Sequence, residues 1–396
     1  MPLPAPAAPT HILRAHPCPI SALHISNNNA RIYSGDSSGW VFVTSSKTLR
    51  TISSWQAHAD SILGIEEAEF GVITHGRDNK LHVWPRPREL PASAQLGGSA
   101  AATDVTTQST EPLYSMDVNA LNYCRFSLLR TSGASDALVA LPNLVDSSCA
   151  DIWTIPACER LHAAIGKSKS APTVPLDGRG DDKTGIIMSL HLFLYSTELS
   201  RQELRLLCAF ENGGITLRHC TSPKGEKTVE GRNWDVLWTS KLHVESIMAM
   251  GVTRDHCVAF TVSADHLIGR YDLNTDDEEK RSTVYRTKHP GNGCVALRDD
   301  GRVCAVGGWD GSIRLYSTKS LKPLGTLRYH KTGCQAILFA HPHSDGSAGG
   351  MPAESDESND SDDEADMADR QRWVIAGGKD SRLSIWSLAS FVKAES

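Results

Sequence analysis

Histidine, hydroxyl and aspartate side chains recur in this order along the chain, and together they are the residue types of a nucleophilic catalytic triad. The sets are His58, Thr74 and Asp78; His243, Thr261 and Asp265; His289 and Asp310; and His330 and Asp380. The first three histidines precede their aspartates by 20, 22 and 21 residues. One active site needs only one such set, so repetition at a steady spacing favours a structural role in a repeated unit.

Other sequence signals of catalysis or cofactor binding are missing. The chain contains no GxxxxGK[ST] phosphate loop and no HExxH metal motif. Its ten cysteines form no CxxC pair, and we interpret them as buried, reduced thiols. His341 and His343 flank Pro342 in a loop, which is a weak signal for a metal site. We therefore predict a protein that is not an enzyme and that holds no cofactor and no metal.

The elements that position these residues can be read from a second spacing, since each aspartate is followed six residues later by Trp or Tyr. The pairs are Asp78 and Trp84, Asp265 and Tyr271, Asp310 and Tyr316, and Asp380 and Trp386. The residues between them alternate or are mostly apolar, which is typical of a strand that leaves a polar turn. Without three insertions at about 85–112, 163–185 and 343–371, seven units of about 44 residues remain, the length of a four-stranded propeller blade. We predict an all-β, seven-bladed propeller with disordered or irregular insertions, in which 196–207 is the one candidate helix.

The two ends of the chain predict how the ring closes. Repeat seven ends after its third strand, while the segment 10–16, THILRAH, is strand-like and precedes repeat one. Adding this segment to the last blade would remove unpaired strand edges at the seam of the ring. We predict a single propeller over residues 10–391, with a flexible N-terminus at 1–9 and a C-terminal tail at 392–396.

Some repeats depart from the pattern. In repeat one, Ser38 stands in the place of the turn aspartate and Thr44 in the place of the aromatic residue. Val306 and Ala376 stand in the place of the hydroxyl residue in repeats six and seven, so we expect their networks to be incomplete. Repeats three and four are the most irregular, and their loops are candidates for a partner surface.

The formal net charge of −6 comes from one segment, because residues 354–369 carry nine acidic side chains and no basic one. Such a composition predicts a disordered loop. Three acidic residues follow Ser361, which is the pattern of a site for acidic-directed kinases, and phosphate would add charge and acceptor oxygens. The run Asp360, Ser361, Asp362 and Asp363 resembles the phosphorylated motif that PIH-domain co-chaperone subunits read. A solvated loop without a partner is the alternative.

Several classes of partner are disfavoured by composition. No apolar run approaches the roughly 20 residues that span a bilayer, and the N-terminus has no signal-peptide pattern. Nothing in the sequence resembles the broad basic face that binds duplex DNA. We therefore expect a cytosolic or nuclear protein without membrane or direct nucleic-acid contact.

Five segments resemble the WD-repeat family and, within it, the fungal ASTRA-associated protein 1 family: 11–25, 74–84, 118–126, 140–153 and 287–334. The resemblance implies that the histidine, hydroxyl, aspartate and aromatic side chains of a blade form one hydrogen-bond chain. It also implies a scaffold subunit of the ASTRA complex, linked to chromatin remodelling and to the TTT co-chaperone that matures phosphatidylinositol-3-kinase-related kinases. Nuclear location follows from the same resemblance, with the cytoplasm as a second compartment. The alternative is a histone-tail or phosphopeptide reader that uses the propeller channel.

Overall fold

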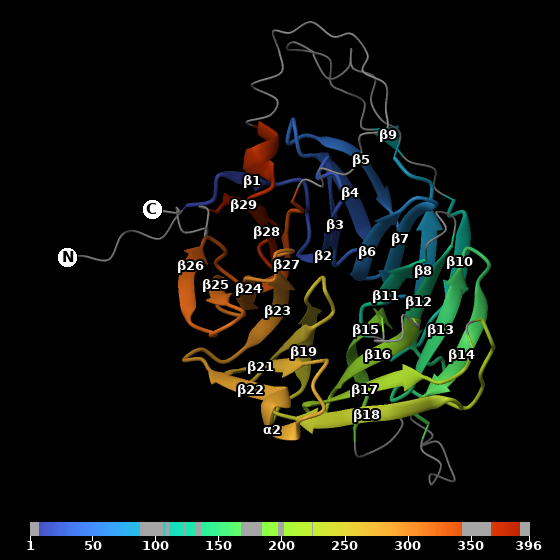
Figure 1. The fold of residues 1–396 in the computed structure, drawn as a ribbon. Helices are drawn as coiled ribbons and strands as arrows, with labels where there is room; N and C mark the ends of the chain where they lie inside the picture. Colours follow the sequence, from blue (N-terminus) through green and yellow to red (C-terminus); the bar gives the residue numbers. More distant parts are fainter. Residues whose placement is uncertain are drawn as a thin grey trace, which may run out of the picture.

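The computed structural model describes residues 8–87, 106–107, 111–121, 123–131, 136–167, 184–196, 202–223, 225–342 and 366–388. These residues form seven sheets arranged in a ring around a central axis (Figure 1). The all-β, seven-bladed propeller predicted from the repeat spacing is therefore confirmed. Among the described residues, no helix is long and apolar enough to cross a membrane.

The first four blades follow the chain in order. Blade one contains β2 (Ile20–Ile25), β3 (Arg31–Asp36), β4 (Trp40–Ser45), β5 (Thr51–Gln56) and the short β9 (Thr106–Thr107). Blade two contains β6 (Ile62–Ala68), β7 (Gly71–Gly76), β8 (Lys80–Trp84) and β10 (Tyr114–Asp117). Blade three contains β11 (Ser127–Arg130), β12 (Ala137–Pro142), β13 (Ala150–Ile155) and β14 (Glu159–Ile165). Blade four contains β15 (Ile187–Ser196), β16 (Gln202–Phe210), β17 (Gly214–Cys220) and β18 (Trp234–Lys241).

The remaining three blades complete the ring. Blade five contains β19 (Ile247–Val252), β20 (Val258–Ser263), β21 (Leu267–Asp272) and β22 (Ser282–Arg286), preceded by the short helix α2 (Glu278–Arg281). Blade six contains β23 (Asn292–Leu297), β24 (Val303–Gly308), β25 (Ser312–Ser317) and β26 (Pro323–Arg328). Blade seven contains β27 (Cys334–Phe339), β28 (Trp373–Gly378), β29 (Leu383–Ser387) and the N-terminal β1 (His11–Leu13).

Ring closure by the N-terminal segment is confirmed. β1 pairs antiparallel with β29, and His11 lies opposite Ile385 in the register. A second link joins the same two blades, because Asn29 donates to the backbone oxygen of His341 at 2.7 Å and accepts from its amide at 2.9 Å. The first and last blades are thus joined by a strand pair and by a reciprocal amide pair.

The core lies between neighbouring blades. Every residue of the second strand is buried in four of the blades, in β3, β7, β24 and β28. Glycine allows the blades to approach closely, since a Cβ added at Gly35 would lie 2.8 Å from the side chain of Ile62 in the next blade. The same contact recurs at the seam, where a Cβ at Gly377 would lie 2.5 Å from Ile20. Apolar burial between blades therefore supplies the main stabilisation of the ring.

The predicted insertions contain more regular structure than expected. β9 pairs parallel with β5 and lies inside the predicted insertion 85–112. β14 extends into 163–185, and residues 366–370 of the insertion 343–371 are helical. The helix predicted for 196–207 is wrong, because 202–207 belongs to β16. Outside the described residues lie 88–105, 108–110, 168–183 and 343–365 of these insertions, residues 1–7, residues 392–396 and the run Asp360, Ser361, Asp362 and Asp363.

Candidate functional site

The most complete side-chain network of the blades lies in blade two. His58, which precedes β6, contacts the Asp78 carboxylate through Nδ1 at 2.9 Å and the Thr74 hydroxyl through Nε2 at 2.8 Å. The Trp84 indole donates to the same hydroxyl at 2.8 Å. Because the Asp78 carboxylate can only accept, the proton of the His58 ring lies on Nδ1, and the Thr74 hydroxyl donates to Nε2. Burial would raise the pKa of Asp78, but hydrogen bonds from His58 and the Ala59 amide lower it below its usual value.

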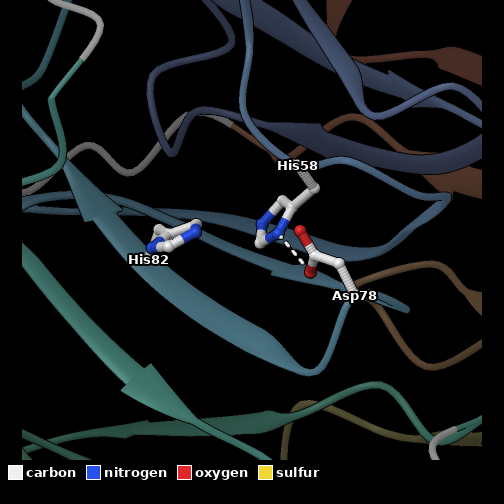
Figure 2. A group of neighbouring side chains, drawn as sticks. All are labelled: His58, Asp78 and His82. Carbon is white, nitrogen blue, oxygen red and sulfur yellow. Dashed lines mark hydrogen bonds and ion pairs between the residues drawn. The ribbon is translucent and has the colours of Figure 1, made fainter.

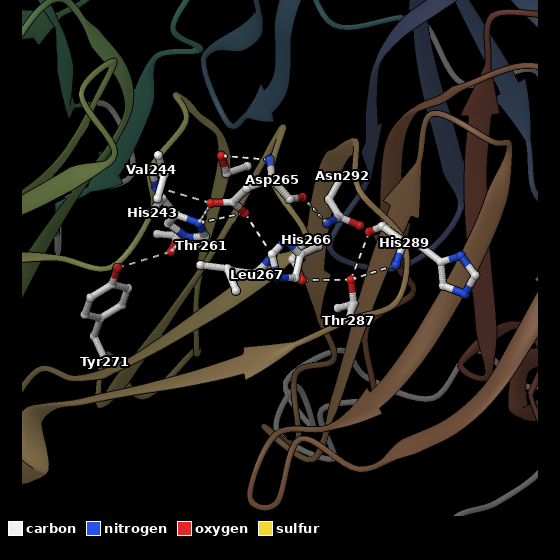
Figure 3. A network of polar contacts seen from close by, with 11 residues as sticks. His243, Val244, Thr261, Asp265, His266, Leu267, Tyr271, Thr287, His289 and Asn292 are labelled. Atoms are coloured by element: carbon white, nitrogen blue, oxygen red, sulfur yellow. Dashed lines mark hydrogen bonds and ion pairs between the residues drawn. The ribbon is translucent and has the colours of Figure 1, made fainter.

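Blade five repeats this arrangement with a looser aromatic end. His243 contacts the Asp265 carboxylate at 3.0 Å and Thr261 at 2.8 Å (Figure 3). The Tyr271 hydroxyl lies 3.4 Å from that of Thr261, and burial raises the pKa of Tyr271 to about 12. The neutral phenol of Tyr271 is therefore the last group of this hydrogen-bond network, in the place that the Trp84 indole takes in blade two.

Blade one has a network that the sequence pattern placed wrongly. His16 contacts Asp36 through Nδ1 at 2.9 Å and Ser34 through Nε2 at 2.7 Å. Asp36 stands two positions before Ser38, the residue in the turn slot, and accepts from the Ser38 amide at 2.9 Å. The carboxylate thus binds the imidazole from the end of β3 and still caps the turn. The separation of 20 residues between His16 and Asp36 equals that between His58 and Asp78 and is the signal that could have found it.

Blade seven is more complete than Ala376 led us to expect. His330 contacts Asp380 at 2.9 Å through Nδ1, and its Nε2 lies 2.6 Å from the hydroxyl of Ser384. Ser384 lies opposite Ala376 in the pairing of β28 with β29, so the hydroxyl reaches the same point from the adjacent strand. The hydrogen-bond network ends at Ser384, because the Trp386 indole nitrogen has no hydrogen-bond partner among the described residues.

Blade six lacks the predicted contact between His289 and Asp310. His289 is exposed, and Figure 3 shows its ring directed away from the neighbouring polar residues. Asp310 instead pairs with Arg314 at 2.5 Å and 3.2 Å. A Cβ added at Gly308 would lie 2.7 Å from the Arg314 guanidinium, much as one at Gly76 would lie 2.4 Å from the His58 imidazole. Arg314 therefore fills the space of the missing imidazole. Tyr316 remains buried beside it.

One position governs these differences, and the sequence pattern missed it. It lies four residues after the turn slot, and its side chain faces the histidine site. Phe42 contacts the ring of His16 with the centroids 4.4 Å apart, and His82 stacks on His58 at 4.7 Å. Ser384 binds His330, and Arg314 takes the place of the histidine in blade six.

The catalytic interpretation fails on burial as well as on repetition. The hydroxyl residues that face the imidazoles are 3% exposed or less, so no substrate can reach them: Ser34, Thr74, Thr261 and Ser384. A nucleophile must approach the reacting carbonyl to within about 3 Å. The networks instead satisfy buried donors and acceptors, which fixes the arrangement of the strands.

His58, Asp78 and His82 are the one group among the described residues with the spacing of metal ligands (Figure 2). Both ring nitrogens of His58 are already occupied, by Asp78 and by Thr74. A metal would have to break this network to gain a third ligand. We therefore expect Zn²⁺ to leave the melting temperature unchanged, and a rise that disappears in His82→Phe would contradict this.

Replacement of His82 by phenylalanine is expected to make the protein less sensitive to acid. Burial lowers the pKa of His82 to about 4, so the folded state binds this proton less readily than the unfolded chain does. Stability present above about pH 6.5 is therefore lost as the pH falls toward 4. In His82→Phe, the denaturation midpoint should fall less steeply between pH 6.5 and pH 4. The change in slope should be at most that expected when unfolding is coupled to the uptake of one proton. Phe42 shows that the slot accepts phenylalanine, and an unchanged slope would refute the assignment.

Comparison with known proteins gives a repeat-family match for two segments and similar proteins for almost the whole chain. Residues 7–45 and 283–317 match the family model described as WD domain, G-beta repeat. Curated proteins called ASTRA-associated protein 1 are similar over almost the entire length. The protein of Aspergillus flavus is 31% identical over 438 residues, which cover 97% of this chain and 98% of the relative. That of Verticillium alfalfae is 31% identical over 409 residues, covering 98% and 94%, and that of Schizosaccharomyces pombe is 25% identical over 405 residues, covering 96% and 98%.

Proposed function

The chain belongs to the fungal ASTRA-associated protein 1 family, and from this premise we propose that it is a non-enzymatic scaffold subunit of the ASTRA complex. The observation that carries the proposal is the similarity of 31% over 97% of the chain to a protein whose name states that association. The burial of the histidine-bound hydroxyls in blades one, two, five and seven supports it, because these side chains hold the strands together and lie out of reach of a substrate. A rigid ring with many exposed loops suits the display of several partner sites at once.

We further propose that this scaffold acts in chromatin remodelling and in the maturation of phosphatidylinositol-3-kinase-related kinases, through the TTT co-chaperone. The support is the family resemblance of the segments 118–126 and 140–153. The first connects β10 of blade two to β11, and the second lies in irregular blade three; both go beyond what a generic WD repeat shares. A nuclear location, with a cytoplasmic pool, is part of the same proposal.

The acidic insertion supplies a candidate docking motif. We propose that phosphorylated Ser361, followed by three acidic residues, is read by a PIH-domain co-chaperone. Phosphate adds about −1.5 to −2 charge at neutral pH and three acceptor oxygens that suit a basic pocket.

Affinity purification with mass spectrometry from a fungal host tests both proposals. We expect the C-terminally tagged chain to recover ASTRA and TTT subunits, because the family association implies them. Ser361→Ala should lose the PIH-domain partner and keep the other subunits, and Ser358→Ala in the same segment is the matched control. Recovery of histones without ASTRA or TTT subunits would favour the reader alternative and overturn the scaffold proposal.

A further inference from the structure

Trp309 occupies an unusual place in blade six. It begins the turn between β24 and β25, directly before Asp310, and its side chain is 51% exposed. The residues at this place in blades one, two, five and seven are small or charged: Ser37, Arg77, Ala264 and Lys379. A large exposed indole at a place where these four blades carry small or charged side chains is a candidate recognition residue, because Trp is enriched among the residues that dominate binding.

The indole lies on a floor of glycine backbone. The Trp309 amide donates to the Gly291 carbonyl at 2.7 Å, which fixes the turn against the preceding loop. A Cβ added at Gly291 would lie 2.7 Å from the indole, and one at Gly293 would lie 3.2 Å from its nitrogen. One side of the ring therefore packs on main chain, and the exposed remainder is held in a fixed position. A preorganised aromatic side chain loses little entropy on binding.

Exposed lysines lie on three neighbouring segments, of which the loops at Gly291 and Gly333 contact Trp309 and the turn at Lys379 contacts Gly333. Lys288 lies in the loop that leads to Gly291, and Lys331 lies in the loop that leads to Gly333. A Cβ at Gly333 would lie 3.4 Å from the Trp309 backbone and 3.7 Å from the Lys379 side chain. Among the described residues, no ion pair forms with these three lysines, so their charge is available to a partner's negative charge.

The carboxylates of the same segments are already paired. Asp310 is neutralised by Arg314 at 2.5 Å, and Asp380 holds His330 at 2.9 Å. Because Arg314 has replaced the imidazole in blade six, His289 is free to face solvent beside Lys288. The loops 287–291 and 329–333 and the turns 309–311 and 379–382 thus present positive charge without a competing free acid.

We propose that Trp309, Lys288, Lys331 and Lys379 form a docking surface for an acidic peptide segment of a partner protein. An aromatic or aliphatic residue of the peptide packs on the indole, and its carboxylates pair with the lysines. A basic histone tail would meet like charge here. A single-stranded nucleic acid would need several stacking platforms, whereas these segments offer one exposed indole. The inference rests on the proposed scaffold role and names the chemistry of one partner segment.

Fluorescence anisotropy with the full chain tests the surface. The probe is a labelled ten-residue peptide of Asp and Glu with one central Phe. We expect saturable binding that weakens as salt rises from about 50 to 500 mM, because the lysines act through exposed charge. Trp309→Ala should weaken binding by about tenfold or more, as loss of a central aromatic contact does. The double variant Lys331→Glu, Lys379→Glu should do the same.

The matched control reverses the charge of two lysines between β25 and β26, at the opposite end of the strands of the same blade, with Lys319→Glu and Lys322→Glu. It should bind the probe as the unmodified chain does, and melting curves should show that all variants are folded. No saturable binding, equal weakening by the control, or stronger binding of a Lys-rich peptide or a single-stranded oligonucleotide would each overturn the proposal. The result is independent of the purification experiment, so failure of this surface leaves the ASTRA association standing.

Discussion

Deletion of residues 1–16 is expected to remove most of the protein from the soluble fraction. The deletion takes away β1, which leaves β29 as an unpaired edge, and it also removes His16 from the network of blade one. Asp36 and Ser34 would then lose a buried partner, at a cost of about 1–3 kcal/mol for each unsatisfied group. An exposed strand edge in addition favours pairing between chains. Sedimentation of the expressed protein and the melting temperature of the soluble remainder measure the effect.

Two shorter deletions separate the causes. Removal of residues 1–13 takes away β1 but keeps His16, so it should give an intermediate loss of soluble protein. Removal of residues 1–7 takes away no described contact and should leave the melting temperature unchanged. A full deletion that melts at the temperature of the intact chain would show that β1 does not hold the ring together.

Replacement of Thr74 by valine is expected to be strongly destabilising although the two side chains have nearly the same shape. The hydroxyl joins His58 to Trp84, and the whole set is buried. Valine preserves the shape but leaves Nε2 of the imidazole and the indole N–H unpaired. We expect a loss of about 2–5 kcal/mol in the free energy of unfolding, because two buried polar groups are orphaned together. The midpoint of urea denaturation measures it.

Two further variants test whether the hydroxyl network is the cause. Thr261→Val should cost less, because the contact from Tyr271 is 3.4 Å long and contributes little. Thr283→Val changes an exposed threonine of β22 and should shift stability by no more than about 0.5 kcal/mol. Equal losses for all three substitutions would mean that the threonine methyl group or strand propensity, and not the network, sets the effect.

The repeat spacing located blades two, five, six and seven directly, and the remaining length of the chain indicated three more. An aspartate in a turn and an aromatic residue six positions later mark the start and end of the third strand, which in an antiparallel blade fixes its neighbours. Two such pairs, at Asp78 and Asp380, therefore located blades two and seven despite the insertions. Closure by residues 10–16 followed from the count of strands and is confirmed by the pairing of His11 with Ile385.

The side-chain networks were harder to predict, because a position in the sequence pattern does not determine which of two paired strands supplies the hydroxyl or carboxylate. The imidazole lies between two paired strands, so Ser384 can replace a hydroxyl that Ala376 lacks. Asp36 works in the same way from two positions earlier than the turn. The cross-strand register reveals the substitution by Ser384, whereas the spacing of 20 residues from His16 could have revealed Asp36.

His289 illustrates the limit of a recurring residue type. Val306 removes the hydroxyl that would have faced Nε2, so a buried imidazole in blade six would have kept an unpaired nitrogen. Arg314 instead satisfies Asp310 and leaves the histidine outside. The spacing of 21 residues persists although the interaction has been lost, and no feature of the spacing itself distinguishes the two cases.

The pairing of His11 with Ile385 also sets an order of events during synthesis on the ribosome. At about 5–20 residues per second, the N-terminal strand emerges roughly 20–75 s before its partner. Throughout that interval the nascent chain carries an unpaired first segment and an uncovered Ile20 face, since both wait for blade seven. Folding of this ring can therefore finish only after β29 has emerged from the ribosome. The growing chain needs protection for longer at its beginning than at any later blade.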